Sequence, residues 1–338
     1  MTSENRKPRI AVDAMGGDLG AESVIPGVVQ AVRDGLDVQV VLYGDPEILR
    51  KGIETAGASD LGIEIEVCTQ NIAMDESPAS AVRGKPDSPI IKAMKHQREG
   101  KVDAVVSAGS TGAMVAASLL ILGRLKSAAR PAIATFIPTV KGESLLVDAG
   151  ANTQCTPEML YSFAVMGDAY CRTMQSLDEP TIGLMNIGGE KSKGNDLTVA
   201  AYAQMSESSL NFTGNVEGNE VLVGACDVLV ADGFTGNIVL KMCEGLASFF
   251  KALGGSGQLE NEELGALKVL AGVIGRRFNY EVYGGAPLLG VDGVSIICHG
   301  RSTPLAITYA VKAAARQVEV GLPSLIEQAL ASIASEEG

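Results

Sequence analysis

The chain repeats one order of elements: a short apolar strand, a glycine-rich turn and then a helix. In its first copy, the strand is expected at 9–12, the turn at 13–18 and the helix at 21–33. Glycine accounts for 40 of the 338 residues, which is well above the usual ~7%. Strands that alternate with helices form a mostly parallel sheet with right-handed crossovers. The sequence therefore predicts an α/β fold.

The same order continues along the chain. Further strands are expected at 38–43, 63–67, 102–106, 132–137, 144–147, 181–186, 228–230 and 294–298, and helices at 47–56, 113–125, 157–174 and the C-terminal end. The uncharged run at 104–123 is long enough for a membrane span. Its first half, however, carries three serines and threonines and two glycines, so we expect a buried strand, a turn and a buried helix.

Residues 237–278 carry two apolar stripes at helical spacing, separated by GGSG at 254–257. This pattern predicts a helical hairpin that protrudes from a single domain covering residues 1–338. Three roles stay open for the apolar faces: packing within the hairpin, a dimer interface, or contact with a membrane surface. A local basic cluster lies here, formed by Lys251, Lys268, Arg276 and Arg277.

Composition excludes several classes of protein. The formal net charge is −13 and aromatic residues make up 4% of the chain, so nucleic acid is not an expected partner. Six scattered cysteines without a Cys-x-x-Cys pair indicate reduced thiols in the cytoplasm. The polar N-terminus predicts no signal peptide.

Six turns rich in glycine and polar residues follow the expected strands, at 13–18, 107–113, 148–152, 187–195, 232–237 and 299–302. In a parallel sheet, the turns at the carboxyl ends of the strands meet at one crevice. Small residues at a strand-to-helix turn leave backbone N–H groups free to bind an anion. Lys191 and Lys193 add positive charge. The sequence therefore predicts one anion-binding crevice.

Familiar catalytic motifs are absent from the sequence. It contains no Walker P-loop, no Gly-x-Gly-x-x-Gly in the first turn, no Gly-x-Ser-x-Gly and no Cys/His metal cluster. His96 is expected to face solvent, whereas His299 lies in the turn set. The strand-end aspartates Asp13, Asp18, Asp148 and Asp232 fit either a divalent cation or caps on turns and helices.

Nine segments resemble the PlsX family of bacterial phosphate acyltransferases. They are IAVDAMGGD at 10–18, VSAGSTGA at 106–113, LVDAGAN at 146–152, NIGGE at 186–190, KGN at 193–195, FTGNVEG at 212–218, DGFTGN at 232–237, YGGAPLLG at 283–290 and HGRS at 299–302. Three positions depart from the family pattern: Ser110 replaces Asn, Ala149 replaces Val and Arg301 replaces a small residue.

The resemblance implies a three-layer α/β/α body like that of phosphotransacetylases and the isocitrate dehydrogenase group. It implies a reversible transfer of a long-chain acyl group from acyl carrier protein to inorganic phosphate. No cofactor and no metal ligand are expected, and metal dependence stays open. The acyl phosphate would pass to a glycerol-3-phosphate acyltransferase in the membrane. The resemblance also implies a cytoplasmic homodimer that contacts the inner face of the cell membrane peripherally.

The roles expected from the resemblance and the turn positions are as follows. Lys193, Asn237, His299 and Asn186 are the expected catalytic residues, with the asparagines donating to the oxyanion and His299 protonating the leaving thiolate. Asp13, Gly16, Gly17, Ser107, Gly109, Thr111, Gly112, Asp148, Asn152, Lys191 and Asp232 are expected to bind substrate. The hairpin is expected to hold the acyl chain, and Arg276 and Arg277 to dock the acidic carrier protein.

Three alternatives stay open at this point. One is a phosphotransacetylase-like enzyme that uses acyl-CoA. A dehydrogenase of the related fold is a second, although the dinucleotide fingerprint is missing. The third is a non-enzymatic scaffold at the membrane, for which the polar turns would be dispensable.

Overall fold

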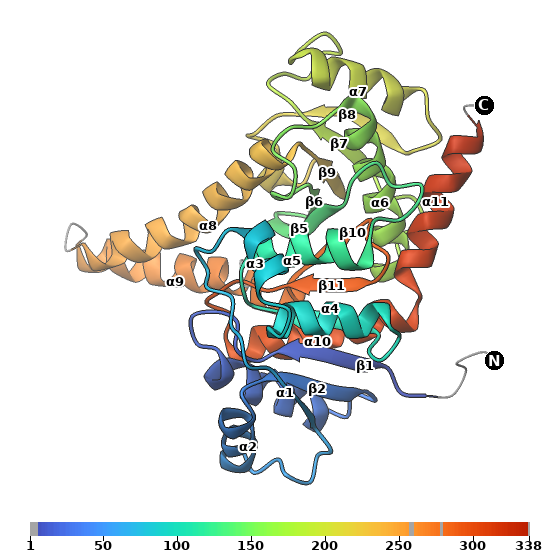
Figure 1. Ribbon diagram of the computed structural model, residues 1–338. Helices are drawn as coiled ribbons and strands as arrows, with labels where there is room; N and C mark the ends of the chain where they lie inside the picture. The colour runs from blue at the N-terminus through green and yellow to red at the C-terminus, as the bar shows by residue number, and fades with distance from the viewer. Residues whose placement is uncertain (1–5, 257–259, 278–279, 337–338) are drawn as a thin grey trace. The chain divides into compact units, whose positions relative to one another are not determined.

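The computed structural model describes residues 6–256, 260–277 and 280–336 (Figure 1). The chain divides into two compact units: unit 1 is Met1–Pro131 with Tyr280–Gly338, and unit 2 is Ala132–Asn279. Unit 2 is thus one continuous segment, whereas unit 1 is assembled from both ends of the chain. The expectation of one single domain stays a prediction.

Unit 1 contains a six-stranded sheet in the order β3-β2-β1-β4-β11-β10. All neighbours are parallel except β10 and β11, which are antiparallel. The strands are β1 (Arg9–Asp13), β2 (Gln39–Gly44), β3 (Glu64–Val67), β4 (Ala104–Ser107), β10 (Ala286–Leu289) and β11 (Val294–Ile297). Its helices are α1 (Ala21–Arg33), α2 (Pro46–Thr55), α3 (Pro78–Gly84), α4 (Pro89–Arg98), α5 (Thr111–Ala117), α10 (Pro304–Glu319) and α11 (Leu322–Glu336).

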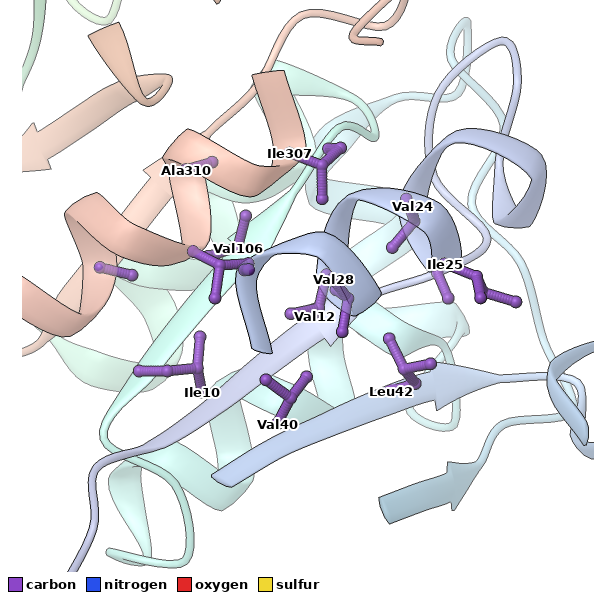
Figure 2. Close-up of a cluster of buried hydrophobic side chains, with 14 of the residues drawn as sticks. Ile10, Val12, Val24, Ile25, Val28, Val40, Leu42, Val106, Ile307 and Ala310 are labelled. Carbon is purple, nitrogen blue, oxygen red and sulfur yellow. The ribbon is translucent and has the colours of Figure 1, made fainter. Parts of the chain in front are cut away.

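Helices cover both faces of the unit 1 sheet. Alternate residues of a strand point to opposite faces, and Ile10 and Val12 of β1 join the apolar cluster formed with α1 and α10 (Figure 2). Val28 of α1 and Ile307 of α10 are buried in that cluster. Helix α4 contacts β1, β2 and β4, and we assign it to the opposite face, toward which the intervening residue Ala11 points. The α/β fold expected from the sequence is confirmed.

Unit 2 contains a five-stranded sheet in the order β5-β6-β9-β7-β8. The first pair is antiparallel and the others are parallel. The strands are β5 (Ala132–Thr139), β6 (Gly142–Val147), β7 (Ile182–Met185), β8 (Phe212–Val216) and β9 (Val228–Val230). Helix α6 (Pro157–Met174) packs against β6 and β9, and against α7 (Asp196–Ser206).

The predicted hairpin consists of α8 (Gly233–Gly255) and α9 (Asn261–Arg277), which contact each other. Its first helix begins four residues before the predicted start at 237. The apolar stripes are buried only in part, because Met242 and Phe249 of α8 and Leu270 of α9 are 71%, 57% and 47% exposed. Within the described part of the chain, no helix combines the length and the apolar character that crossing a bilayer requires.

The buried helix expected at 113–125 is wrong in its second half. Helix α5 ends at Ala117, and a π-helical turn, Ser118–Leu122, follows it. Ser118 is fully buried and its hydroxyl lies 3.2 Å from the hydroxyl of Ser295 on β11. Short 3₁₀ turns at Val221–Val223 and Tyr280–Tyr283 complete the described elements.

Candidate functional site

Asp13 joins the first two turns of unit 1. It ends β1, pairs in register with Ser107 of β4 and is buried. One carboxylate oxygen accepts the N–H groups of Met15 and Gly16, both at 3.0 Å, and the other accepts the Ser107 hydroxyl at 2.7 Å. Burial raises the pKa of Asp13, and these hydrogen bonds oppose that rise.

The Ser107 hydroxyl also accepts the N–H of Gly109 at 2.9 Å. This hydrogen bond corrects an expectation, because the Gly109 N–H binds the protein itself and does not point at a ligand. A narrow hollow beside Asp13, Gly16 and Gly109 is too tight to admit a water molecule. An anion of phosphate size therefore does not fit in that hollow.

Close packing explains the two glycines of the first turn. A Cβ at Gly16 would lie 2.5 Å from an oxygen of Asp13 and 2.6 Å from the nitrogen of Gly109. Gly17 has φ +86°, and a Cβ there would lie 2.8 Å from the carbonyl oxygen of Gly300. The Asp18 N–H also donates to Gly300, at 2.7 Å. Three of the predicted turns of unit 1 therefore lie side by side.

Helix α5 begins in the second of these turns. Ser110 caps it by accepting the Ala113 N–H at 3.4 Å. Serine and asparagine are equally good caps, so the departure from the family pattern at Ser110 preserves this role. Thr111 is exposed at the first helical position, and Gly112 packs against Pro78 of α3.

His299 is exposed in the third turn. Its Nδ1 accepts the backbone N–H of Arg301 at 3.1 Å. Since a backbone N–H only donates, the neutral imidazole carries its proton on Nε2. The Nε2–H group is thereby oriented as a donor.

Asp148 holds a turn of unit 2 by hydrogen bonds to its carboxylate, as Asp13 does in unit 1. Its carboxylate is fully buried and accepts the N–H groups of Ile133, Gly150, Ala151 and Asn152 at 2.7–3.0 Å. The Asn152 side chain donates to it as well, at 3.0 Å. Burial raises the pKa of Asp148, against the effect of these hydrogen bonds. The Asn152 amide thus holds its own turn together.

Asp232 caps helix α8 through the N–H groups of Phe234 and Thr235, both at 3.0 Å. The start of α8 also packs onto the Asp148 turn, where the Gly233 N–H donates to the Asn152 carbonyl at 2.7 Å. Asn237 is exposed and lies next to Gly150. A Cβ built on Gly150 would lie 3.6 Å from the side-chain oxygen of Asn237. The two turns therefore form one surface, on which the Asn237 amide is exposed.

The loop 187–195 of unit 2 carries Lys191 and Lys193, both of which are exposed. Asn186 is buried before this loop; its amide nitrogen donates to the Lys193 carbonyl at 3.0 Å and its oxygen accepts the Ile187 N–H at 2.8 Å. In the structure, both ends of the Asn186 amide hold the loop. That Asn186 also faces a substrate carbonyl stays a prediction.

The structure thus gathers the expected residues into two sets, each at the carboxyl ends of strands. Unit 1 brings together Asp13, Gly16, Gly17, Ser107, Gly109, Thr111, Gly112 and His299. Unit 2 holds Asp148, Asn152, Asp232 and Asn237 in one corner, and Asn186, Lys191 and Lys193 at the 187–195 loop. A single crevice built from both sets stays a prediction. Across the described residues, no group of three metal-ligating side chains comes together.

His96 differs from expectation, since it is half-buried and does not simply face solvent. Its Nδ1 lies 2.8 Å from the hydroxyl of Tyr43, and the two rings meet edge to face. Burial is the largest influence on its pKa and lowers it. The sequence indicated a helical stretch around His96, but its polar composition suggested an exposed helix and not one that covers Tyr43 of β2.

The fold is that of the phosphotransacetylases. A phosphotransacetylase from Streptococcus pyogenes superimposes with a TM-score of 0.62 at 16% identity, covering 92% of this chain and 94% of that one. The family described as "Fatty acid synthesis protein" matches residues 8–325.

Curated relatives identify the family by name. "Phosphate acyltransferase" of Desulforamulus reducens is 46% identical over 95% of this chain and 97% of its own length. The enzyme of the same name from Heliobacterium modesticaldum is 44% identical with the same coverage. The chain belongs to this family and is an acyltransferase. The non-enzymatic scaffold is therefore set aside.

Proposed function

We propose that this enzyme transfers a long-chain acyl group from acyl carrier protein to inorganic phosphate, giving an acyl phosphate for phospholipid synthesis. The observation that carries the proposal is the similarity to phosphate acyltransferases over 95% of the chain. The two sets of polar turns support it, because they offer donors and positive charge and no activated nucleophile.

The chemistry suits such an arrangement. A phosphate oxygen attacks the thioester carbonyl carbon, so a C–O bond forms, the C–S bond breaks and its electron pair leaves on sulfur. The thiolate then takes up a proton. Because phosphate is the nucleophile, the protein needs only to bind it, align it with the carbonyl and stabilise the oxyanion.

The proposed roles follow from which groups are exposed. In unit 2, the ammonium groups of Lys191 and Lys193 bind the phosphate. In unit 1, the exposed Thr111 hydroxyl is a hydrogen-bond donor for substrate. The Asn237 amide donates to the oxyanion. The Nε2–H of His299 stabilises the leaving thiolate by a hydrogen bond, and the thiolate takes its proton from water. Asp13, Ser107, Asp148, Asn152 and Asn186 shape the turns.

We assign the acyl chain and the membrane to the hairpin of α8 and α9. Met242, Phe249 and Val269 leave apolar surface exposed on it, as the peripheral membrane contact of a cytoplasmic homodimer requires. Sedimentation with anionic vesicles tests the membrane contact, and loss of binding in Phe249→Glu is the expected result. The acyl phosphate would then reach a membrane-bound glycerol-3-phosphate acyltransferase.

The decisive assay measures release of free carrier protein from long-chain acyl carrier protein with and without phosphate. We expect release to depend on phosphate and to exceed release from the matching acyl-CoA. A clear preference for acyl-CoA would favour the phosphotransacetylase-like alternative. Release that does not depend on phosphate would contradict the proposal altogether.

A further inference from the structure

The loop 187–195 is exposed at eight of its nine positions, yet hydrogen bonds hold it at both ends and in the middle. Asn186 binds it at Ile187 and at the Lys193 carbonyl. Within the loop, the Lys193 N–H donates to the Glu190 carbonyl at 3.0 Å. Asn195 closes it by capping α7 together with Thr198. A loop of this kind has one preferred shape.

A second asparagine, outside the loop, holds its middle. Asn215 lies on β8, paired in register with Leu184 of β7. Its amide nitrogen donates to the Glu190 carbonyl at 2.9 Å. Because only the NH₂ end can donate to a carbonyl, this bond also fixes the direction of the amide oxygen.

The amide oxygen of Asn215 is buried, and among the described residues it has no hydrogen-bond partner. A buried acceptor without a partner lowers stability. An apolar side chain of similar size would avoid that loss. The stability of the fold alone therefore does not explain an asparagine at this position. The hydrogen bond from its amide to the Glu190 carbonyl of the loop does explain it.

We propose that Asn215 is a positioning residue for phosphate binding. Together with Asn186 it holds the loop at the carbonyls of Glu190 and Lys193, and so fixes where the Lys191 and Lys193 side chains begin. Lysines on a loose loop would have to be ordered when phosphate binds, which weakens binding. This inference rests on the proposed function, because it takes Lys191 and Lys193 to be phosphate ligands.

The test uses Asn215→Leu, which keeps the branched shape and the number of side-chain heavy atoms and removes both the donor and the unpartnered acceptor. Asn211 offers a matched control, since its amide donates to the Glu179 carbonyl at 3.1 Å just before the same strand. We expect Asn215→Leu to raise the KM for phosphate about tenfold, which corresponds to ~1.4 kcal/mol. The KM for the acyl donor and the urea midpoint should stay close to those of the wild type, and Asn211→Leu should leave all three unchanged.

Hydrogen exchange of the peptide covering 187–195 tests the hold directly, and we expect faster exchange in Asn215→Leu. Unchanged exchange together with an unchanged KM for phosphate would overturn the inference. A variant in which both KM values rise and the urea midpoint falls would overturn it as well. Asn215→Ala gives the same readouts if the leucine variant does not fold. If Lys193→Ala leaves the KM for phosphate unchanged while exchange in Asn215→Leu rises, the phosphate role fails and the hold on the loop stands.

Discussion

Asp13 and Asp148 are buried aspartates at strand ends, and both hold the following turn by hydrogen bonds. Each ends or follows a central strand, is buried, and accepts N–H groups from the turn after its own strand. Neither carboxylate is left free to bind a ligand of its own, so the alternative of a divalent cation held by the strand-end aspartates receives no support from their geometry. Their hydrogen bonds instead keep the turns in shape.

Lys193 is the residue on which the phosphate proposal depends most. Because charge-assisted contacts to an anion contribute about 1.5–3 kcal/mol, Lys193→Ala should raise the KM for phosphate roughly tenfold or more. Steady-state kinetics with varied phosphate measures it. Lys141, an exposed lysine in the turn between β5 and β6, is the control, and Lys141→Ala should have no effect. Equal KM values for the two variants would remove Lys193 from the phosphate site.

His96 predicts a pH dependence of stability. Burial lowers its pKa from the ordinary 6.5, so below that pH the unfolded chain binds more protons than the folded one. The free energy of unfolding should therefore fall as the pH drops from 6.5. His96→Gln keeps an acceptor for the Tyr43 hydroxyl and does not titrate, so its urea midpoint should fall less between pH 6.5 and 5. Parallel curves for the two proteins would refute this.

At the scale of elements, two helix caps allow an effect on stability to be distinguished from an effect on activity. Asp45 caps α2 through the N–H groups of Glu47 and Ile48, as Asp232 caps α8. Replacing either aspartate by alanine should cost about 1 kcal/mol of unfolding free energy, measured in urea. Only Asp232→Ala should also reduce turnover, because its helix begins beside Asn237. Equal turnover in the two variants would show that the α8 cap has no part in the reaction.

The sequence predicted nine of the eleven described strands, because apolar runs bounded by glycine turns have few other solutions, and it missed β8 and β10. It missed α3 and α7, and in place of α4 it indicated only a polar helical stretch around His96, although Ser88-Pro89 and the Asn195–Thr198 pair are start signals for helices. It also gave too long a helix after Thr111, since a fully buried serine such as Ser118 does not reveal a π-helical turn.

The candidate site was predictable as a set of turns and not as a set of roles. In a sequence, a short polar residue at a strand end cannot be assigned to one of two roles: its side chain can donate to a ligand or to its own turn. Asn152 and Asn186 turned out to do the second. Asn215 lies within a family-like segment, FTGNVEG, and still received no role, because its partner is 25 residues away in the sequence.

At the scale of the whole molecule, the net charge of −13 would oppose the approach of the proposed donor, an acidic carrier protein, so the proposal requires a local basic surface for docking. The side chains of Arg276, Arg277 and Lys251 lie outside the described residues. Reversing Arg276 and Arg277 to Glu should raise the KM for acyl carrier protein several-fold, because like charges repel at contact, and leave the KM for phosphate unchanged. An unaltered KM for the carrier would refute the docking role.

The split of unit 1 between the two ends of the chain has a consequence for biosynthesis. Helix α1 packs against α10, so the N-terminal core stays open on the ribosome until the final stretch of the message has been translated. Unit 2 can close earlier, since it is continuous. A premature stop codon anywhere after unit 2 would therefore damage the part of the protein that was made first.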